Sequence, residues 1–178
     1  MTVIEHAQLR AILPHRGPIL LLDRVTALRE GVSLRALKAV TGSECCYHDI
    51  PEGAPSHEYA YPASLLLESF GQAAAVLWLT RSSPPGEPAG DGLLMFAAAR
   101  DCVLHEQVLP GDVLRHEVRL EHVKGASAVA SGETWVNDRL VATMGSFIAV
   151  RRPSPRPGQT SGRDRGQHSE GEHDDPDQ

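Results

Sequence analysis

One stretch of this chain, residues 64–80, restricts the possible folds more than any other. It reads SLLLESFGQAAAVLWLT and contains a single charged side chain, Glu68. A helix on the surface of a domain shows a broad charged face, whereas a helix that is apolar all round is buried. We therefore predict a long helix over residues 64–80 that lies inside the domain.

A narrow polar stripe interrupts the apolar surface of this helix. Ser64, Glu68 and Gln72 are spaced four residues apart, so they share one helical face. Gly71 and residues 73–75, all alanine, are small enough to let a sheet approach closely. Because burying an unpartnered carboxylate costs several kcal/mol, the presence of Glu68 on this helix needs an explanation. It points to solvent at the helix edge, pairs with an arginine, or serves a chemical function.

The segments around the helix have the character of short strands. The turn signals between them are Gly31, Pro110-Gly111-Asp112, Lys124-Gly125 and Asn137-Asp138. Strands are expected at residues 19–28, 32–40, 93–104, 112–123, 127–137 and 139–150. One helix and a run of antiparallel strands predict an α+β domain in which the sheet wraps the helix.

Length and local composition indicate a single domain with a polar tail. The chain has 178 residues, which suits one domain with a well-buried core. Residues 1–151 are expected to form it. Residues 152–178 have almost no large apolar side chains and are expected to be disordered. Residues 82–92, which read SSPPGEPAGDG, are interpreted as a surface loop.

Composition also excludes several classes of function. A formal net charge of −6 argues against a nucleic-acid binder, which needs clustered positive charge. No continuous apolar run is as long as a membrane span, and the first ten residues do not resemble an export signal. The three cysteines, Cys45, Cys46 and Cys102, form no disulfide framework. We expect a cytoplasmic protein with reduced thiols and with no metal, nucleotide or other cofactor of its own.

Three motifs together resemble a known family. Residues 13–25 read LPHRGPILLLDRV, Pro62 stands six residues before Glu68, and a Pro110-Gly111-Asp112 turn joins two strands. In this order, over nearly all of residues 12–150, they resemble the FabZ-type 3-hydroxyacyl-acyl carrier protein dehydratases, which have the hot-dog fold.

The resemblance implies a dimer with active sites between the subunits. Glu68 would be the acid that protonates the departing 3-hydroxyl, with Gln72 as its support. Backbone N–H groups near Ala63 and Ser64 would polarise the thioester carbonyl. The substrate would be attached to the phosphopantetheine of an acyl carrier protein. Arg16, Arg24, Arg100 or Arg151 could form the docking patch for that acidic partner; ordinary surface arginines are the simpler reading.

The loop before the helix departs from the family pattern. The family has glycine-histidine-phenylalanine-proline-glycine there, whereas this chain reads YHDIPEG at residues 47–53. Matching Ile50-Pro51 to the phenylalanine-proline pair places Asp49 at the position of the catalytic histidine. His48 and His57 are the nearby alternatives. His15, in the opening motif, is interpreted as structural, with its ring bonded to the backbone.

These departures leave three functions open. The first is dehydration of 3-hydroxyacyl thioesters to trans-2-enoyl thioesters in fatty-acid or polyketide biosynthesis. The chain would act as a homodimer, or as the histidine-less subunit of a heterodimer of the kind found in aryl polyene and reducing polyketide pathways. The second is a non-catalytic hot-dog subunit that binds acyl chains or stabilises a partner. The third, ranked lowest, is an acyl thioesterase.

Overall fold

A computed structural model describes residues 2–81 and 93–152. The elements are β1 Thr2–Ile4, α1 His6–Ile12, β2 Arg24–Arg29, β3 Ser33–Ala39, η1 Cys45–Tyr47, η2 Ser56–Tyr59, α2 Ala63–Leu79, β4 Leu93–Leu104, β5 Val113–Lys124, β6 Ser127–Val136 and β7 Arg139–Arg152. The predicted loop at residues 82–92 lies outside the described residues. So does the predicted tail, except for Arg152, which ends β7.

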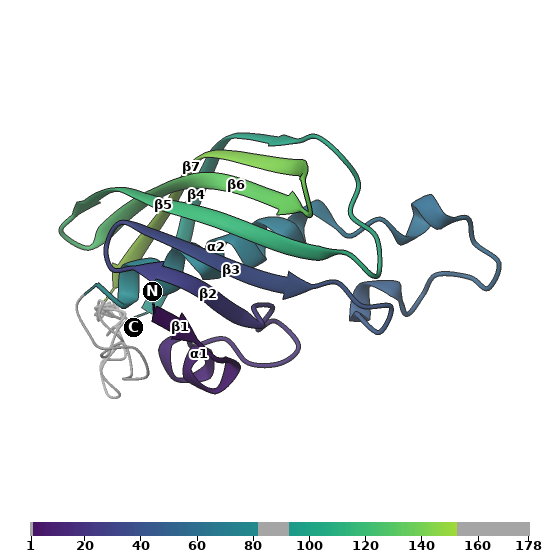
Figure 1. Cartoon of the computed structure of the whole chain (residues 1–178), viewed down its shortest axis with the longest axis horizontal. Coiled ribbons are helices and arrows are strands. Elements are labelled where there is room, and N and C mark those ends of the chain that lie inside the picture. The colour runs from purple at the N-terminus through teal and green to yellow at the C-terminus, as the bar shows by residue number, and fades with distance from the viewer. Residues whose placement is uncertain (1, 82–92, 153–178) are drawn as a thin grey trace, which may run out of the picture.

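The strands form one sheet in the order β1-β2-β3-β5-β6-β7-β4. Every neighbouring pair is antiparallel. The sheet curves around α2, and α1 lies beside β1 near the N-terminus (Figure 1). This is the α+β architecture predicted from the sequence, a long helix wrapped by an antiparallel sheet as in the hot-dog fold.

Helix α2 is the centre of the core, as its composition predicts. It begins and ends one residue earlier than expected, and ten of its seventeen residues are buried. A Cβ at Gly71 would lie 2.6 Å from Cζ of Phe147 on β7, so the small residue does allow close approach of the sheet. Counted through η2, residues 56–79 are apolar and long enough to cross a membrane, but 56% of the most apolar window is buried inside the domain, as in a core helix.

The turns follow the sequence signals, but the N-terminal region was only partly predicted. Gly31, Gly111, Gly125 and Asn137 all have positive φ angles, which glycine and asparagine adopt most readily. Neither β1 nor α1 was expected. The first predicted strand, residues 19–28, begins only at residue 24, because the backbone before it bonds to a side chain of α2 instead of to a strand.

A closed polar network lies inside the core. The ring of His116 on β5 is fully buried. Its Nε2 is 3.0 Å from Oγ of Ser69 on α2, and its Nδ1 is 2.9 Å from Oγ1 of Thr134 on β6. Burial disfavours the charged imidazolium and lowers the pKa of His116 to about 3. The ring is therefore neutral at physiological pH.

Candidate active site

Glu68 lies in the second turn of α2 with its carboxylate partly open to solvent. The side chain is 35% exposed, although most residues of α2 are buried. Nε2 of Gln72, one turn later, donates a hydrogen bond to Glu68 Oε1 over 2.8 Å. The polar stripe predicted from four-residue spacing is thus a bonded pair, with no arginine among the described partners of Glu68.

Gln72 connects this acid to the N-terminal segment. Its amide nitrogen also donates to the carbonyl oxygen of Ile19 over 2.6 Å, and its amide oxygen accepts a hydrogen bond from the N–H of Leu21 over 2.9 Å. Gln72 is only 1% exposed. A buried amide with all these partners has little freedom to turn, so the orientation of Glu68 is coupled to the backbone at residues 19–21.

His15 lies beside the same carboxylate, which the sequence did not reveal. Its Nε2 is 3.5 Å from Glu68 Oε1, and its Nδ1 is buried without a hydrogen-bond partner in the described structure. The interpretation that this ring bonds to the backbone is therefore wrong. The only signal in the sequence was the position of His15 within the LPHR motif.

The N-terminus of α2 opens into a cavity. No side chain caps the helix at Pro62, and the first N–H groups of any helix have no partner within it. Ala63 and Ser64, the predicted carbonyl-polarising positions, are both exposed. The cavity has a volume of about 430 Å³ and is lined by Tyr61, Pro62, Ala63, Leu66, Leu104, His105 and Val108, among others.

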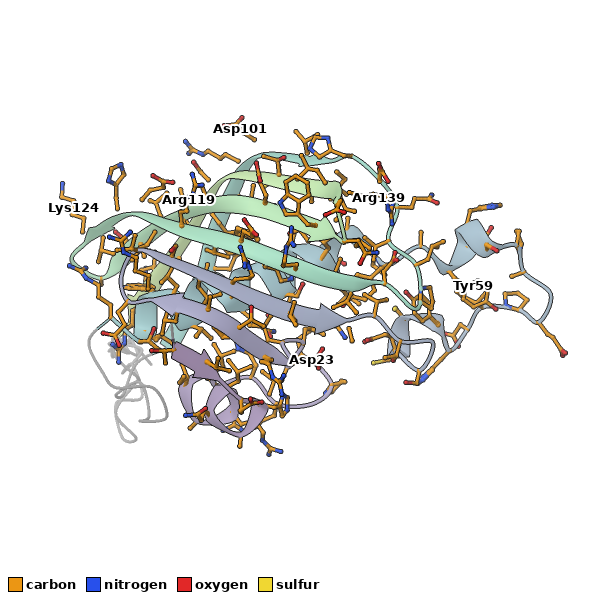
Figure 2. All side chains as sticks on the ribbon, viewed as in Figure 1. Asp23, Tyr59, Asp101, Arg119, Lys124 and Arg139 are labelled. Atoms are coloured by element: carbon orange, nitrogen blue, oxygen red, sulfur yellow. The ribbon has the colours of Figure 1, made fainter. Side chains whose placement is uncertain are left out.

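The three loop candidates lie on the segment between β3 and α2. This segment, with η1 and η2, projects from the body of the domain (Figure 1), and Tyr59 marks its return toward α2 (Figure 2). His48, Asp49 and His57 are all exposed. Within the described residues, no hydrogen bond or ion pair joins any of the three to Glu68. The structure therefore brings together Glu68 and Gln72, but not the loop candidates, in a single chain.

A buried ion pair fixes the base of this projecting loop. Nζ of Lys38, at the end of β3, bonds to Glu44 Oε1 and to the carbonyl oxygen of Ala39. The side chains of Lys38 and Glu44 are 7% and 15% exposed. At the other end of the loop, Tyr61 donates its N–H to the carbonyl oxygen of Val108. Burial, with a smaller contribution from Glu44, raises the pKa of the Tyr61 phenol, which therefore stays neutral.

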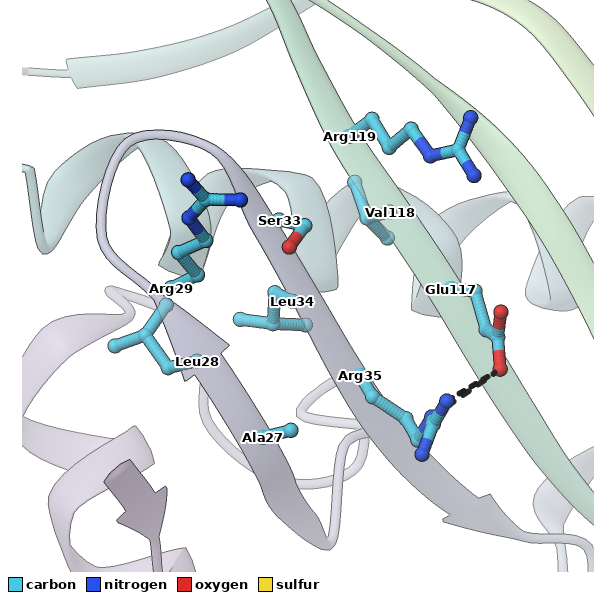
Figure 3. Close-up of a pocket in the computed structure, with 9 residues that line it drawn as sticks. All are labelled: Ala27, Leu28, Arg29, Ser33, Leu34, Arg35, Glu117, Val118 and Arg119. Carbon is cyan, nitrogen blue, oxygen red and sulfur yellow. Dashed lines mark hydrogen bonds and ion pairs between the residues drawn. The ribbon is translucent and has the colours of Figure 1, made fainter. Parts of the chain in front are cut away.

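The arginines proposed for carrier docking do not form one patch. Arg24 pairs with Glu5 beside β1, whereas Arg100 and Arg151 lie on β4 and β7 at the opposite end of the sheet. A different group of arginines, on β2, β3 and β5, borders a cavity of about 360 Å³ that the sequence did not indicate (Figure 3). Its members are Arg29, Arg35 and Arg119, and Arg35 is paired with Glu117 at 3.0 Å.

The described residues form no metal-binding cluster, and two of the three cysteines have thiols that are hard to ionise. Within residues 2–81 and 93–152, no three His, Cys, Asp or Glu side chains are grouped so that they could hold a metal ion. Burial is the main cause that raises the pKa values of Cys46 and Cys102. Both thiols are therefore less readily ionised than usual, which makes them poorer nucleophiles.

Comparison with known proteins assigns the family. Residues 13–145 match the FabA-like domain. A 3-hydroxyacyl-[acyl-carrier-protein] dehydratase FabZ from Haemophilus ducreyi is 37% identical over 139 residues, which cover 78% of this chain and 85% of that protein. The FabZ of Macrococcus caseolyticus is 32% identical over 84% of this chain and 97% of its own length.

Solved structures agree on the fold. The dehydratase heterocomplex ApeI:P from Xenorhabdus doucetiae contains a chain that matches with a TM-score of 0.66 at 17% identity, covering 82% of this chain and 91% of that one. A hypothetical thioesterase from Streptococcus pneumoniae, solved with coenzyme A, matches with a TM-score of 0.53 at 12% identity, covering 72% and 84%. At these identities the likeness concerns the fold alone. The sequence matches, however, extend over most of the chain and show that this protein belongs to the FabA-like, FabZ-type dehydratase family.

Proposed function

We propose that this protein removes water from 3-hydroxyacyl thioesters attached to an acyl carrier protein, giving trans-2-enoyl thioesters. The observation that carries the proposal is the state of Glu68. It is the one carboxylate on the buried helix, one of its oxygens is bonded by Gln72, and its side chain remains 35% exposed. The relatives named FabZ support the same reaction and the same class of substrate.

The reaction requires a base and an acid on the two sides of the substrate. The base takes a proton from the carbon next to the thioester carbonyl. The C–O bond at carbon 3 then breaks, and protonated Glu68 gives its proton to the departing hydroxyl, which leaves as water. Hydroxide is a poor leaving group unless it is protonated. The free N–H groups at Ala63 and Ser64 would stabilise the negative charge that develops on the carbonyl oxygen.

We propose that the site is completed in a dimer through the edge of β4. This twelve-residue strand ends the sheet order, so one side of it lacks a strand partner in the described structure. Met95, Phe96, Val103 and Leu104 on it are exposed, Phe96 by 57%. A long apolar edge of this kind is a surface on which another strand pairs. At the other end of the sheet, β1 is only three residues long.

The projecting loop suits a base that acts across such an interface. His48, His57 and Asp49 are exposed on a loop whose base is fixed by the Lys38–Glu44 pair. In a homodimer, one of these side chains would serve as the base for the partner's site. In a heterodimer, a second hot-dog subunit would supply the histidine, and this chain would supply Glu68.

The test is dehydration of a 3-hydroxyacyl-carrier substrate, followed by mass spectrometry. The full-length protein is assayed alone and with hot-dog subunits that contain the family's loop histidine. Glu68→Gln is expected to lower the rate about 100- to 10,000-fold, the usual contribution of a general acid. Glu30→Gln, which changes an exposed carboxylate in the β2–β3 turn, is the matched control and should leave the rate unchanged.

Other outcomes point to the remaining functions. An unchanged rate for Glu68→Gln in every combination would rule out Glu68 as the acid. If the wild-type chain accelerates a partner enzyme and Glu68→Gln does so equally well, the chain is a supporting subunit. Release of free thiol without loss of water would identify a thioesterase.

A further inference from the structure

We propose that His15 is a positioning residue for Glu68, which directs an N–H group on Nε2 toward one carboxylate oxygen. This inference rests on the proposed function, because it assigns a role in the same site. It starts from two observations on one side chain. Nε2 of His15 is 3.5 Å from Glu68 Oε1, and Nδ1 is buried with no partner in the described structure.

The contact with Glu68 indicates which ring nitrogen bears the proton. In a neutral imidazole, one ring nitrogen bears a proton and the other only a lone pair. Nδ1 lacks a partner in either tautomer, but Oε1 of Glu68 accepts the hydrogen bond of Gln72 and so presents lone pairs, which attract a proton on Nε2 and repel a lone pair there. The proton therefore belongs on Nε2, the nitrogen that faces Glu68. At 3.5 Å the contact is longer than a good hydrogen bond, and such contacts often shorten when substrate binds.

The backbone around His15 is itself restrained. Nη1 of Arg16 donates to the carbonyl oxygens of Leu13 and His15. Beyond the next turn, Gln72 bonds to Ile19 and Leu21. The buried amide of Gln72 thus connects the two residues. It bonds directly to the Glu68 side chain, and it holds the backbone that follows His15.

Both contacts meet the same oxygen of the carboxylate. Gln72 donates to Oε1 at 2.8 Å, and His15 Nε2 faces Oε1 as well. No hydrogen bond or ion pair of the described residues engages Oε2. With Oε1 bonded by Gln72 and faced by His15, the second oxygen is the one free to hold and deliver the proton. His15 therefore sets which carboxylate oxygen reacts and where it points, without contacting the substrate.

Two substitutions at one position separate this role from a structural one. Glutamine places an amide nitrogen near the former Nε2, whereas asparagine places it near the former Nδ1, too far from Glu68. We expect His15→Asn to lower kcat about 10- to 100-fold with KM nearly unchanged, since misplacing a reacting group by about 1 Å can cost that much. His15→Gln is expected to retain most of the wild-type kcat. The assay uses the full-length protein in the combination that is active.

A second measurement does not depend on activity. The ¹⁵N chemical shifts of the His15 ring in the full-length protein report which nitrogen bears the proton. We expect protonation on Nε2 in the wild type and a changed Nε2 shift in Glu68→Gln. In Glu68→Gln this readout also shows whether the fold is kept; the His15 variants lack the ring, so urea unfolding checks their fold.

The outcomes distinguish the two proposals. A proton on Nδ1, or a wild-type kcat for His15→Asn while Glu68→Gln is inactive, would overturn the role of His15 and leave the dehydratase assignment intact. Equal losses in the Asn and Gln variants would also overturn it. An Nε2–H ring in a protein that dehydrates nothing in any combination would overturn the proposed function, and the role of His15 in that reaction with it.

Discussion

Two neighbouring residues of α2 belong to opposite kinds of polar cluster. Ser69 faces the core, where its hydroxyl meets His116, which in turn meets Thr134; all three side chains are buried, and none of their polar atoms lacks a partner. Glu68, one residue earlier, is partly exposed, and the His15 ring beside it has an unpartnered nitrogen.

This difference between the two clusters indicates that the His116 network stabilises the fold, whereas the Glu68 cluster has groups available for chemistry. A fully bonded network in the core makes the fold more specific and has no free group to offer a ligand. A cluster with an open carboxylate oxygen and an orphan nitrogen costs stability, and such sites are frequent where ligands bind. The histidine with the strongly lowered pKa is therefore not the one we assign to the reaction.

Gln72 is buried like the His116 network but bonds to Glu68. Among substitutions at Gln72, His116 and Ser69, Gln72→Leu should lower the free energy of unfolding most. The substitution leaves the Leu21 N–H and the Ile19 carbonyl without their partner in a buried position, and it removes the donor to Glu68. We expect unfolding to be easier by about 3 kcal/mol, since each buried group left unpaired costs about 1–3 kcal/mol. Urea unfolding measures this loss. A wild-type midpoint would mean that the N-terminal segment is not secured by Gln72.

The second largest effect is expected in the pH dependence of the free energy of unfolding, through the buried His116 ring. His116 has a folded pKa of about 3 and an unfolded value of about 6.5. The unfolded chain therefore binds a proton that the folded chain refuses. This contribution is fully present above pH 6.5 and is lost as the pH falls toward 3.

The size of that loss can be isolated with one variant. Glutamine at position 116 has no titratable group. Between pH 6.5 and 4.5, the free energy of unfolding of the wild type should therefore fall by about 2 kcal/mol more than that of His116→Gln. Urea unfolding at several pH values gives both curves. Parallel curves would mean that the His116 ring is accessible to protons in the folded state.

Ser69→Ala should have the smallest effect of the three. Removing the hydroxyl leaves His116 Nε2 without its partner, which is expected to cost about 1 kcal/mol. The dehydration rate should not change, because the hydroxyl is buried away from solvent. A rate loss like that of Glu68→Gln would break the division between the clusters, since the closed network would then serve the reaction.

The central helix and the sheet could be predicted because their signals are local. An apolar segment with one acid indicates burial, and turns marked by Gly31, Gly111, Gly125 and Asn137 divide the strands. His116 lies two residues from both Leu114 and Val118 in β5, so the period of two places all three on the buried face. Its partners could not be predicted, because they come from α2 and β6.

The candidate site was predicted only in part, for a related reason. Glu68 and Gln72 are one turn apart, and helical spacing alone brings them together. The contact of His15 with Glu68 depends on how residues 13–22 fold back on α2, which no periodicity encodes. The run ILLL at 19–22 is apolar enough to be a strand, yet the backbone at Ile19 and Leu21 bonds to the Gln72 amide.

Aromatic rings connect the exposed sheet edge to the helix that bears the acid. The ring of Phe96 on β4 lies 4.6 Å from that of Phe147, and Phe147 occupies the space that a Cβ at Gly71 would need, three residues after Glu68. In the proposed dimer, a subunit that covers Phe96 would thus contact α2, which carries Glu68, through two stiff rings. In that dimer, subunit assembly and the position of Glu68 would be mechanically coupled, and we expect a bulkier residue at position 71 to disturb both.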